Sequence, residues 1–287
     1  PLAWLGWRGG RGRKRNPSKQ QPPTAEGGGK YAIVTTACIP WLTGTSVNPL
    51  LRAAYLSHRG KDVTLVVPWL AESEQPIVFA KGCLFRTPKE QVKSVEGWLA
   101  RNLDFTPASL RLQFYPGRYS EDKHSILPVG DLTQYTRGAD TVVLEEPEHL
   151  TWYHHGRRWT DTCSNVVGVV HTNYVEYARR EPGGFILAPA LYRVNQWVCS
   201  TYCHKVIKLS GAVQPLPYEA TCNINGCSKR FLDVGDKWRG KKFTKGAYYL
   251  GKMQWGKGWA PAGATCHLPT KQPYTLIGGN GDPGPYF

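Results

Sequence analysis

Carboxylates, histidines and aromatic side chains gather in one short stretch, VVLEEPEHLTWYHHGRRW, which runs from 142 to 159. Its three carboxylates, three histidines and three aromatics could form a metal site, a catalytic cluster, or a loop that forms salt bridges with nearby arginines. No HExxH pattern sets two histidines one helical turn apart, so a zincin-type site is disfavoured and we predict no bound metal. Trp152 and Tyr153 suit a sugar or a lipid headgroup better than a metal. The chemistry of the stretch stays open on these residues alone.

A second group of polar residues also follows an apolar run. In NVVGVVHTNY the residues His171, Thr172 and Asn173 come directly after the valines, and ADTVVLEE and KVIKLS have the same form. Buried parallel strands read as continuous apolar runs, and ligands bind beyond the carboxyl ends of such strands. We therefore expect Glu146 and His171 to lie at the same edge of one sheet.

The residues from 31 onward predict the elements that would position these groups. KYAIVTTA and DVTLVVPWL read as strands, TGTSVNP between them as a turn-rich loop, and LLRAAYLSHRG as a helix closed by Gly60. A strand, a glycine-bearing loop, a helix and a second strand form a βαβ unit, which implies a parallel sheet with right-handed crossovers. The predicted fold class is α/β, with helices on both faces of a mostly parallel sheet. The cluster after 145 is expected in a loop rather than on a helix.

The two ends of the chain differ from this pattern. Residues 1–29 are rich in Gly, Pro and basic side chains and read as a disordered basic arm. Residues 260–287 hold many Gly and Pro without periodicity, and we expect an irregular tail foreign to the fold.

The formal net charge is +15, of which +10 belongs to residues 30–259, so an anionic partner is indicated. No run approaches the roughly 18 apolar residues of a membrane-spanning helix.

Four cysteines and a histidine have a loose spacing that needs a separate interpretation: Cys199, Cys203, His204, Cys222 and Cys227. Structural zinc sites usually have compact knuckles of two to four intervening residues with Gly or Lys beside them, and this group matches that pattern only loosely. Buried or half-buried free thiols are therefore the preferred interpretation.

Several long blocks together resemble one family. IVTTACIPWLTGTSVNPLLRAAYL, VTLVVPWL, FYPGRYSEDKHSILPVGD, VLEEPEHLTWYHHGRRW, GVVHTNYVEYARRE and FTKGAYYLGKMQWGKG resemble the digalactosyldiacylglycerol synthases of plants and algae. The match runs from about 31 to 259, apart from a weaker patch at 182–190. The resemblance implies a GT-B glycosyltransferase with two Rossmann-like domains, which transfers galactose from UDP-galactose to monogalactosyldiacylglycerol. It also implies a peripheral protein of the chloroplast outer membrane, an anionic membrane surface as a partner, and no cofactor and no nucleic acid.

The resemblance also assigns expected roles to particular residues. Gly44 takes the place of the glycine whose loop lets the backbone approach the donor phosphates, and His171 that of the histidine which hydrogen-bonds the transferred sugar. Lys252 and Lys257 match the basic residues that contact the diphosphate. Glu146, Glu148 and His149 are expected to line the acceptor side of the site, and the sequence assigns no individual role to any of them.

The resemblance divides the chain into expected domains. Residues 30–235 would form the acceptor domain on the membrane side, and residues 236–259 the linker and first unit of the donor domain. The rest of that second domain, with the family's acidic E-x7-E segment, is absent, so we expect an incomplete galactosyltransferase. Two alternatives stay open: a non-catalytic module that binds galactolipid or anionic membranes, and an RNA-binding protein that uses the RGGRGRKR arm. The second lacks a recognised RNA-binding module.

Overall fold

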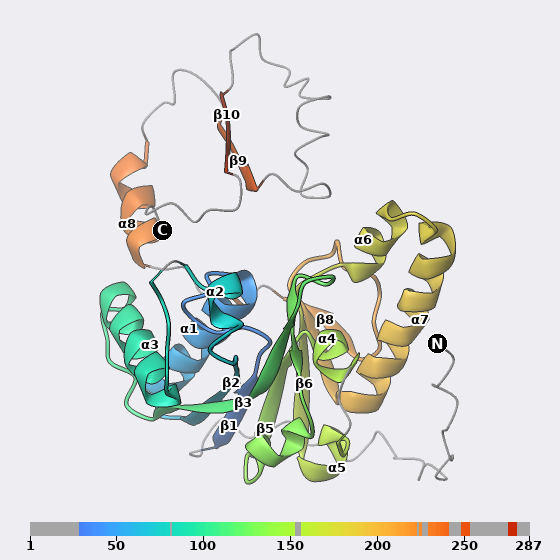
Figure 1. The fold of residues 1–287 in the computed structure, drawn as a ribbon, viewed down its shortest axis with the longest axis horizontal. Helices are drawn as coiled ribbons and strands as arrows, with labels where there is room; N and C mark the ends of the chain where they lie inside the picture. Colours follow the sequence, from blue (N-terminus) through green and yellow to red (C-terminus); the bar gives the residue numbers. More distant parts are fainter. Residues whose placement is uncertain are drawn as a thin grey trace.

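The computed structural model describes residues 29–80, 82–152, 156–222, 224–225, 229–240, 248–252 and 275–279. Figure 1 shows a central sheet with helices against it, in which α1, α2 and α3 (within residues 44–102) lie on the left and α6 and α7 (within residues 174–202) on the right. The predicted basic arm lies outside these residues except for Gly29.

An eight-stranded sheet forms the centre of the fold, with the strand order β4-β3-β2-β1-β5-β6-β7-β8. The strands are β1 Lys30–Val34, β2 Asp62–Trp69, β3 Leu110–Ser120, β4 Ser125–Pro128, β5 Thr141–Glu145, β6 Asn165–Val170, β7 Lys205–Lys208 and β8 Glu219–Thr221. Every pair in this sheet is parallel except β3 with β4. The predicted α/β class and the mostly parallel sheet are confirmed, and the order fits a Rossmann-like domain.

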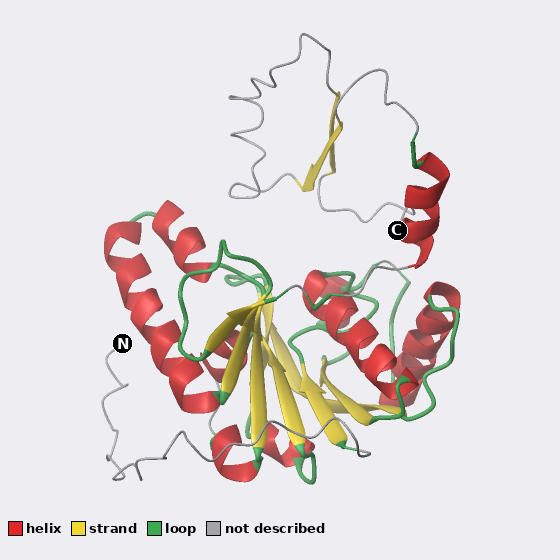
Figure 2. Cartoon of the chain, turned by 180° about the vertical axis from the view of Figure 1, so that it is seen from behind, coloured by secondary structure: helices red, strands yellow, loops and turns green. Residues whose placement is uncertain are grey.

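Helices cover both faces of the sheet, as Figure 2 shows from behind. They are α1 Gly44–His58, α2 Gln75–Val78, α3 Pro88–Asn102, the 3-10 helix η2 Leu132–Thr136, α4 Pro147–Trp152, α5 Trp159–Thr162, α6 Tyr174–Arg180, α7 Gly184–Tyr202 and α8 Lys229–Trp238. None of the described helices combines the length and the apolar character needed to span a bilayer.

The core is two-sided because alternate strand residues point to opposite faces of the sheet. Ala32 and Val34 of β1 belong to the cluster that includes Trp159 of α5, whereas Ile33 packs with Leu50 of α1. The same alternation recurs in β2, β5 and β6. A strand that is buried on both faces must be apolar at nearly every position, which explains the continuous apolar runs in the sequence.

Helix α1 begins at Gly44, earlier than the sequence indicates. We expected TGTSVNP to be a loop, and that prediction is wrong for Gly44 to Pro49. Thr43 is the N-cap, and its amide donates to Ser46 Oγ at 3.2 Å. Pro49 has no N–H to donate to the carbonyl of Thr45, and the Thr35 hydroxyl at the end of β1 donates to that carbonyl instead. The Thr45 carbonyl oxygen therefore accepts a hydrogen bond even though Pro49 cannot donate one.

The carboxyl-terminal part of the chain contains two further strands. The predicted strand at 248–250 is present in β9, Tyr248–Lys252, which pairs in parallel with β10, Thr275–Gly279. The prediction of an irregular tail is wrong for the five residues of β10, and the rest of 260–287 lies outside the described residues. The predicted boundary between residues 235 and 236 falls within α8, and the division into domains remains a prediction.

Candidate functional site

The candidate site lies where the strand order changes direction. From β1 the chain builds outward through β2 and β3 on one side, then returns to place β5, β6 and β7 on the other. At such a switch point the loops after the two central strands diverge, and α/β proteins bind ligands beyond the carboxyl ends there. Gly44 follows β1, Glu146 follows β5 and His171 follows β6, so all three lie at the same edge, which confirms the shared edge expected for Glu146 and His171.

Glu145 is the last residue of β5 and is fully buried, with 0% exposure. Its carboxylate holds two partners from different elements. His171 Nε2 lies 2.6 Å from Glu145 Oε2, and an Arg52 guanidinium nitrogen from α1 pairs with Oε1. Arg52 Nη2 also donates to Asn225 Oδ1 at 3.1 Å. One buried carboxylate thus connects the helix after β1 with the segment after β6.

The charge state of His171 follows from this enclosure. Burial lowers the pKa of His171 below its ordinary value, and Arg52 lowers it further, against the opposing effect of Glu146. At neutral pH the imidazole is therefore uncharged. Because a carboxylate only accepts, Nε2 carries the hydrogen and donates it to Glu145, which leaves Nδ1 as an acceptor.

Glu146 has an unusual backbone for its residue type. Its φ of +55° lies in the left-handed region, which costs a non-glycine residue free energy unless contacts hold it there. Its amide donates to the Val169 carbonyl at 2.8 Å. Its carboxylate accepts from the hydroxyls of Thr172 at 2.6 Å and Tyr174 at 2.9 Å. Strand β6 therefore holds the backbone of Glu146, and the residues after β6 hold its side chain.

Glu148 is a carboxyl group enclosed by protein. It is 1% exposed, and neither of its oxygens has a hydrogen-bond partner among the described residues. Burial, and to a lesser extent the charge of Glu146, raises the pKa of Glu148 to about 8. Its carboxyl group is therefore mostly protonated at neutral pH.

His149 contacts a different part of the sheet. Its Nε2 lies 3.1 Å from the Ile126 carbonyl oxygen and 3.2 Å from Ser125 Oγ, both on β4. The ring is 3% exposed. These contacts explain why a histidine is buried here, and its predicted role on the acceptor side stays a prediction.

The cluster after Glu145 is helical, so the expectation of a loop is wrong for Pro147 to Trp152. Pro147 starts α4, a position at which a missing N–H is harmless. The helix packs closely on β6, because a Cβ built on Gly168 would lie 2.9 Å from Pro147 Cγ and 2.8 Å from Cys203 Sγ. Tyr153 lies outside the described residues, together with His154 and His155.

The predicted donor-binding residues are only partly placed. Gly44 is the first residue of α1, where the backbone amides of a helix start favour an anion. A Cβ on Gly44 would meet only Asn48 Nδ2, at 3.6 Å, so the glycine is not required by space in this structure. Lys252 ends β9, and Lys257 lies outside the described residues.

Sequence analysis missed Arg52 and Tyr174 as members of this cluster. Arg52 interrupts the otherwise apolar run LLRAAYL, and a single cation within such a run was the available signal. Tyr174 begins α6, two residues after Thr172, which brings its hydroxyl to the same carboxylate.

The loose cysteine group has no metal site among the described residues, where no three His, Cys, Asp or Glu side chains are arranged to hold an ion. Cys199 and Cys203 are buried free thiols, whereas Cys222 is exposed. Cys227 lies outside the described residues.

The sheet order and the carboxylate–imidazole pair at the switch point define a Rossmann-like α/β domain with a polar site at its carboxyl edge. No protein-family model matches the chain.

Curated plant proteins give the particular family. The chain is 50% identical over 237 residues to digalactosyldiacylglycerol synthase 1, chloroplastic, of Glycine max, a match that covers 79% of this chain and 30% of that protein. It is 49% identical over 248 residues to the protein of the same name from Arabidopsis thaliana, covering 83% of this chain and 31% of the relative. Against digalactosyldiacylglycerol synthase 2, chloroplastic, of Glycine max it is 50% identical over 79% of this chain and 51% of the relative.

These identities confirm the resemblance: over 79% to 83% of its length the chain is a relative of the digalactosyldiacylglycerol synthases. The chain spans 30% to 51% of the length of these relatives.

Proposed function

We propose that this chain provides the acceptor domain of a galactosyltransferase that moves galactose from UDP-galactose to monogalactosyldiacylglycerol. The names of the relatives support the galactolipid product. The observation that carries the proposal is the buried Glu145, which holds His171 at the carboxyl edge of the switch point. A polar group fixed in this way beside diverging loops suits the recognition of a sugar.

The described residues have distinct parts in the proposed reaction. The neutral His171 binds a hydroxyl of the transferred galactose through Nδ1, because Nε2 is already engaged with Glu145. Arg52 and Glu145 are positioning residues, since they fix the orientation of the ring without contacting the sugar. Glu146 holds the segment after β6 through Thr172 and Tyr174.

The leaving diphosphate is negatively charged, and its stabilisation is assigned to the start of α1 and to basic residues. The helix has fifteen residues, and its first amides near Gly44 form the positive end of the helix dipole. Lys252 and Lys257 are proposed as the diphosphate ligands of the donor domain.

The GT-B arrangement with a cleft between two domains and the location on the chloroplast outer membrane are parts of the same proposal.

Substitution of His171 tests the proposal in a form as long as the relatives. We expect His171→Ala to lower the rate of galactose transfer about a hundredfold or more, by analogy with the loss of one donor to a reacting group. The rate is measured with radiolabelled UDP-galactose and vesicles that contain monogalactosyldiacylglycerol. The matched control is His58→Ala, because His58 stacks on Phe105 at the far end of α1. A wild-type rate in His171→Ala would remove His171 from the site.

The second candidate is a non-catalytic module that binds galactolipid membranes. The net charge of +15 indicates an anionic partner and favours this candidate. Vesicle flotation beside the transfer assay, both in a form as long as the relatives, separates the two candidates, since a binding module floats with galactolipid vesicles and transfers nothing.

A further inference from the structure

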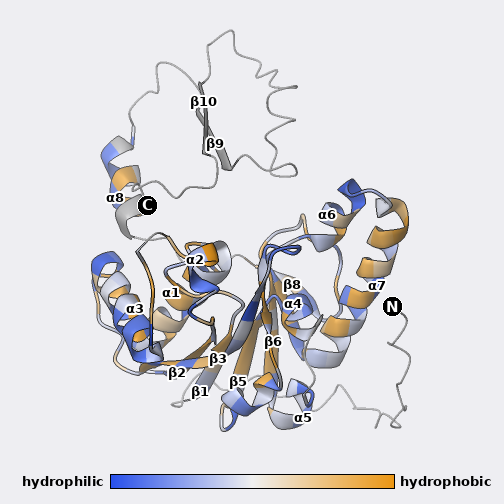
Figure 3. Cartoon of the chain, in the orientation of Figure 1, coloured by the Kyte–Doolittle hydropathy of each residue, from blue (hydrophilic) through white to orange (hydrophobic). Residues whose placement is uncertain are grey.

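The outer face of α7 is apolar, although it is exposed. Its buried residues form the inner stripe Gly184, Ala188, Asn195, Val198 and Cys199. The large apolar residues exposed on this helix are Phe185, Ile186, Leu187, Val194 and Trp197. Ile186 is 66% exposed and Trp197 is 53% exposed. Figure 3 shows this apolar character along much of α7. A surface helix normally presents polar residues to solvent, so the face indicates a partner.

The turn before α7 brings cations to the start of this face. Gly183 has a φ of +76°, and a Cβ on Gly184 would lie 2.4 Å from the Ala178 carbonyl oxygen. The two glycines therefore permit a turn that joins the end of α6 closely to α7. Arg179 and Arg180 end α6 and share the single carboxylate of Glu176. An apolar hollow of about 480 Å³ between the two helices is lined by both Arg179 and Phe185.

We propose that the outer face of α7, with Arg179 and Arg180, is the surface by which this domain lies on an anionic lipid bilayer. The proposal rests on the function proposed above, which requires a lipid acceptor. Helix α7 carries Arg193 and no acidic residue, and Trp197 supplies the aromatic ring that favours the membrane interface. With Glu176 and Glu181 included, the α6–α7 unit has a net charge of +1. Insertion of apolar side chains therefore outweighs charge in holding the domain there.

The position of the unit in the fold connects this surface to the site. Helix α6 begins at Tyr174, whose hydroxyl bonds to Glu146, only three residues after His171. Figure 1 shows α6 and the start of α7 beside the upper end of the sheet. The part of a bilayer against the start of α7 therefore lies on the side of the edge that holds Glu146 and His171, where a lipid acceptor can reach it from the membrane.

Vesicle flotation of the chain tests the surface without any transfer reaction. The vesicles contain phosphatidylcholine with phosphatidylglycerol, but no galactolipid and no sugar donor, so the outcome is independent of catalysis. We expect the triple substitution Ile186→Ser, Leu187→Ser and Trp197→Ser to lower the binding constant about tenfold or more, also at high salt where charge is screened. The matched control is Ile77→Ser with Leu84→Ser, which removes comparable exposed apolar side chains near α2. Equal losses in both variants, or none in the triple variant, would overturn the proposal.

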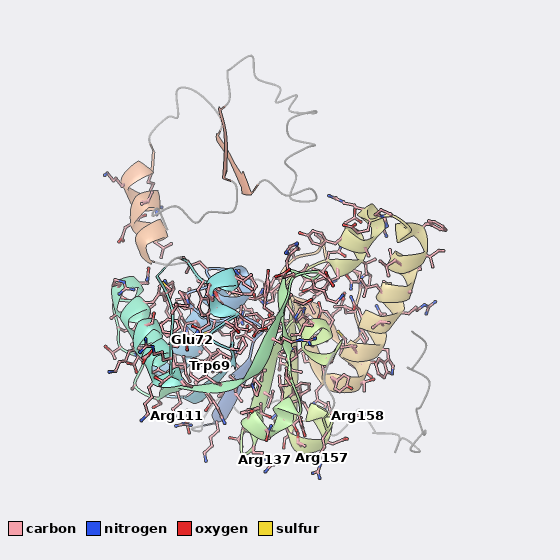
Figure 4. The ribbon with its side chains drawn as sticks, in the orientation of Figure 1. Trp69, Glu72, Arg111, Arg137, Arg157 and Arg158 are labelled. Carbon is pink, nitrogen blue, oxygen red and sulfur yellow. The ribbon has the colours of Figure 1, made fainter. Side chains whose placement is uncertain are left out.

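A second pair of variants tests the cations. We expect Arg179→Ala with Arg180→Ala to weaken binding to the anionic vesicles and to leave binding to pure phosphatidylcholine unchanged. The control is Arg157→Ala with Arg158→Ala, an adjacent exposed pair that precedes β6 at the opposite end of the sheet (Figure 4). Equal weakening by both pairs would show that only overall charge matters, and the assigned surface would be wrong.

Two further measurements test the depth of Trp197 in the bilayer and the oligomeric state of the chain. Bromine-labelled lipids should quench the fluorescence of the chain, and we expect Trp197→Phe to reduce that quenching, because Trp197 enters the bilayer. Undiminished quenching in Trp197→Phe would contradict the proposal.

Size-exclusion chromatography shows whether the face instead joins two copies of the chain. A wild-type dimer that becomes a monomer in the triple variant would overturn the proposal.

Discussion

The ionisation of Glu148 affects the stability of this fold. Its pKa is raised from 4.5 to about 8, so the folded protein keeps a proton that the unfolded chain has released. Between these two pH values the unfolded chain binds fewer protons, and the free energy of unfolding falls as the pH rises. We predict that Glu148→Gln removes this loss, so the variant gains stability relative to the wild type from pH 5 to pH 8, by a few kcal/mol at most.

Chemical denaturation at several pH values measures this difference. The matched control is Glu176→Gln, because Glu176 is a partly exposed carboxylate on α6. Its effect on unfolding should change little over the same range. Parallel curves for the wild type and Glu148→Gln would contradict the prediction.

Arg52 affects both the pKa of His171 and the stability of the domain. Removing its positive charge in Arg52→Met should raise the pKa of His171, because Arg52 now lowers it. The variant also leaves the buried Glu145 with fewer compensating contacts, and breaking such a pair destabilises a protein by about 3 kcal/mol. Titration of the imidazole by NMR and chemical denaturation measure the two effects.

An exposed ion pair provides the control for Arg52. Arg111 pairs with Asp62 at 2.7 Å and its side chain is 61% exposed. Arg111→Met should change the free energy of unfolding by less than about 1 kcal/mol. An equally small change in the free energy of unfolding for Arg52→Met, with an unchanged pKa of His171, would contradict the prediction. The contacts through Glu145 would then contribute nothing measurable.

At the level of elements, the contact between α4 and β6 depends on one missing side chain. A Cβ on Gly168 would approach Cys203 Sγ and Pro147 Cγ to less than 3 Å. We predict that Gly168→Ala lowers the free energy of unfolding by about 1–3 kcal/mol, as expected for overpacking. Gly211→Ala is the control, since nothing lies within 4 Å of its Cβ position. Thermal denaturation compares the Gly168→Ala and Gly211→Ala variants. Equal unfolding temperatures would show that α4 can shift without loss of stability.

The sequence predicted the apolar strands β1, β2, β5, β6 and β7, but it did not predict β3, β4 or β8, and it placed the helix limits less well. Parallel strands are covered on both sides, so their apolar runs are visible without any partner. Helix α1 begins within TGTSVNP, where composition indicates a loop, because Thr35 satisfies the carbonyl freed by Pro49. That hydrogen bond joins the helix to the residue after β1, so the sequence around Pro49 does not indicate it. The short helix α4 was missed for a similar reason, since its packing on Gly168 comes from a distant strand.

The candidate site was predicted in part. The edge that holds Gly44, Glu146 and His171 follows from the parallel topology. The Arg52–Glu145–His171 contacts could not be predicted, because they depend on which helix crosses over which strand. The resemblance assigned the expected substrates and residue roles that the isolated residues left open. The relatives match the chain over the same region.

For a polypeptide of these 287 residues by itself we predict lipid association without galactose transfer. Two lysines and the start of α1 are the expected diphosphate contacts, and exposed charge pairs contribute about 0–1 kcal/mol each. Millimolar affinity alone corresponds to roughly −4 kcal/mol. Calorimetry with UDP-galactose should therefore show binding weaker than millimolar, and a radiolabel assay should show no product. Turnover, or tighter donor binding, would contradict this prediction.

The contacts of Glu145 also bear on the order in which the protein assembles. The Glu145 carboxylate joins residues 52 and 171, and Arg52 in turn bonds to residue 225, so positions far apart along the chain are connected. Contacts of such long sequence separation form late, after the loops between them have been closed. We therefore expect the Arg52–Glu145 contact to form only after the segments on both sides of β1 have joined the sheet. The appearance of a neutral, shielded His171 would thus report that the parallel sheet has closed on both sides of β1, which makes this imidazole an internal marker of completed folding.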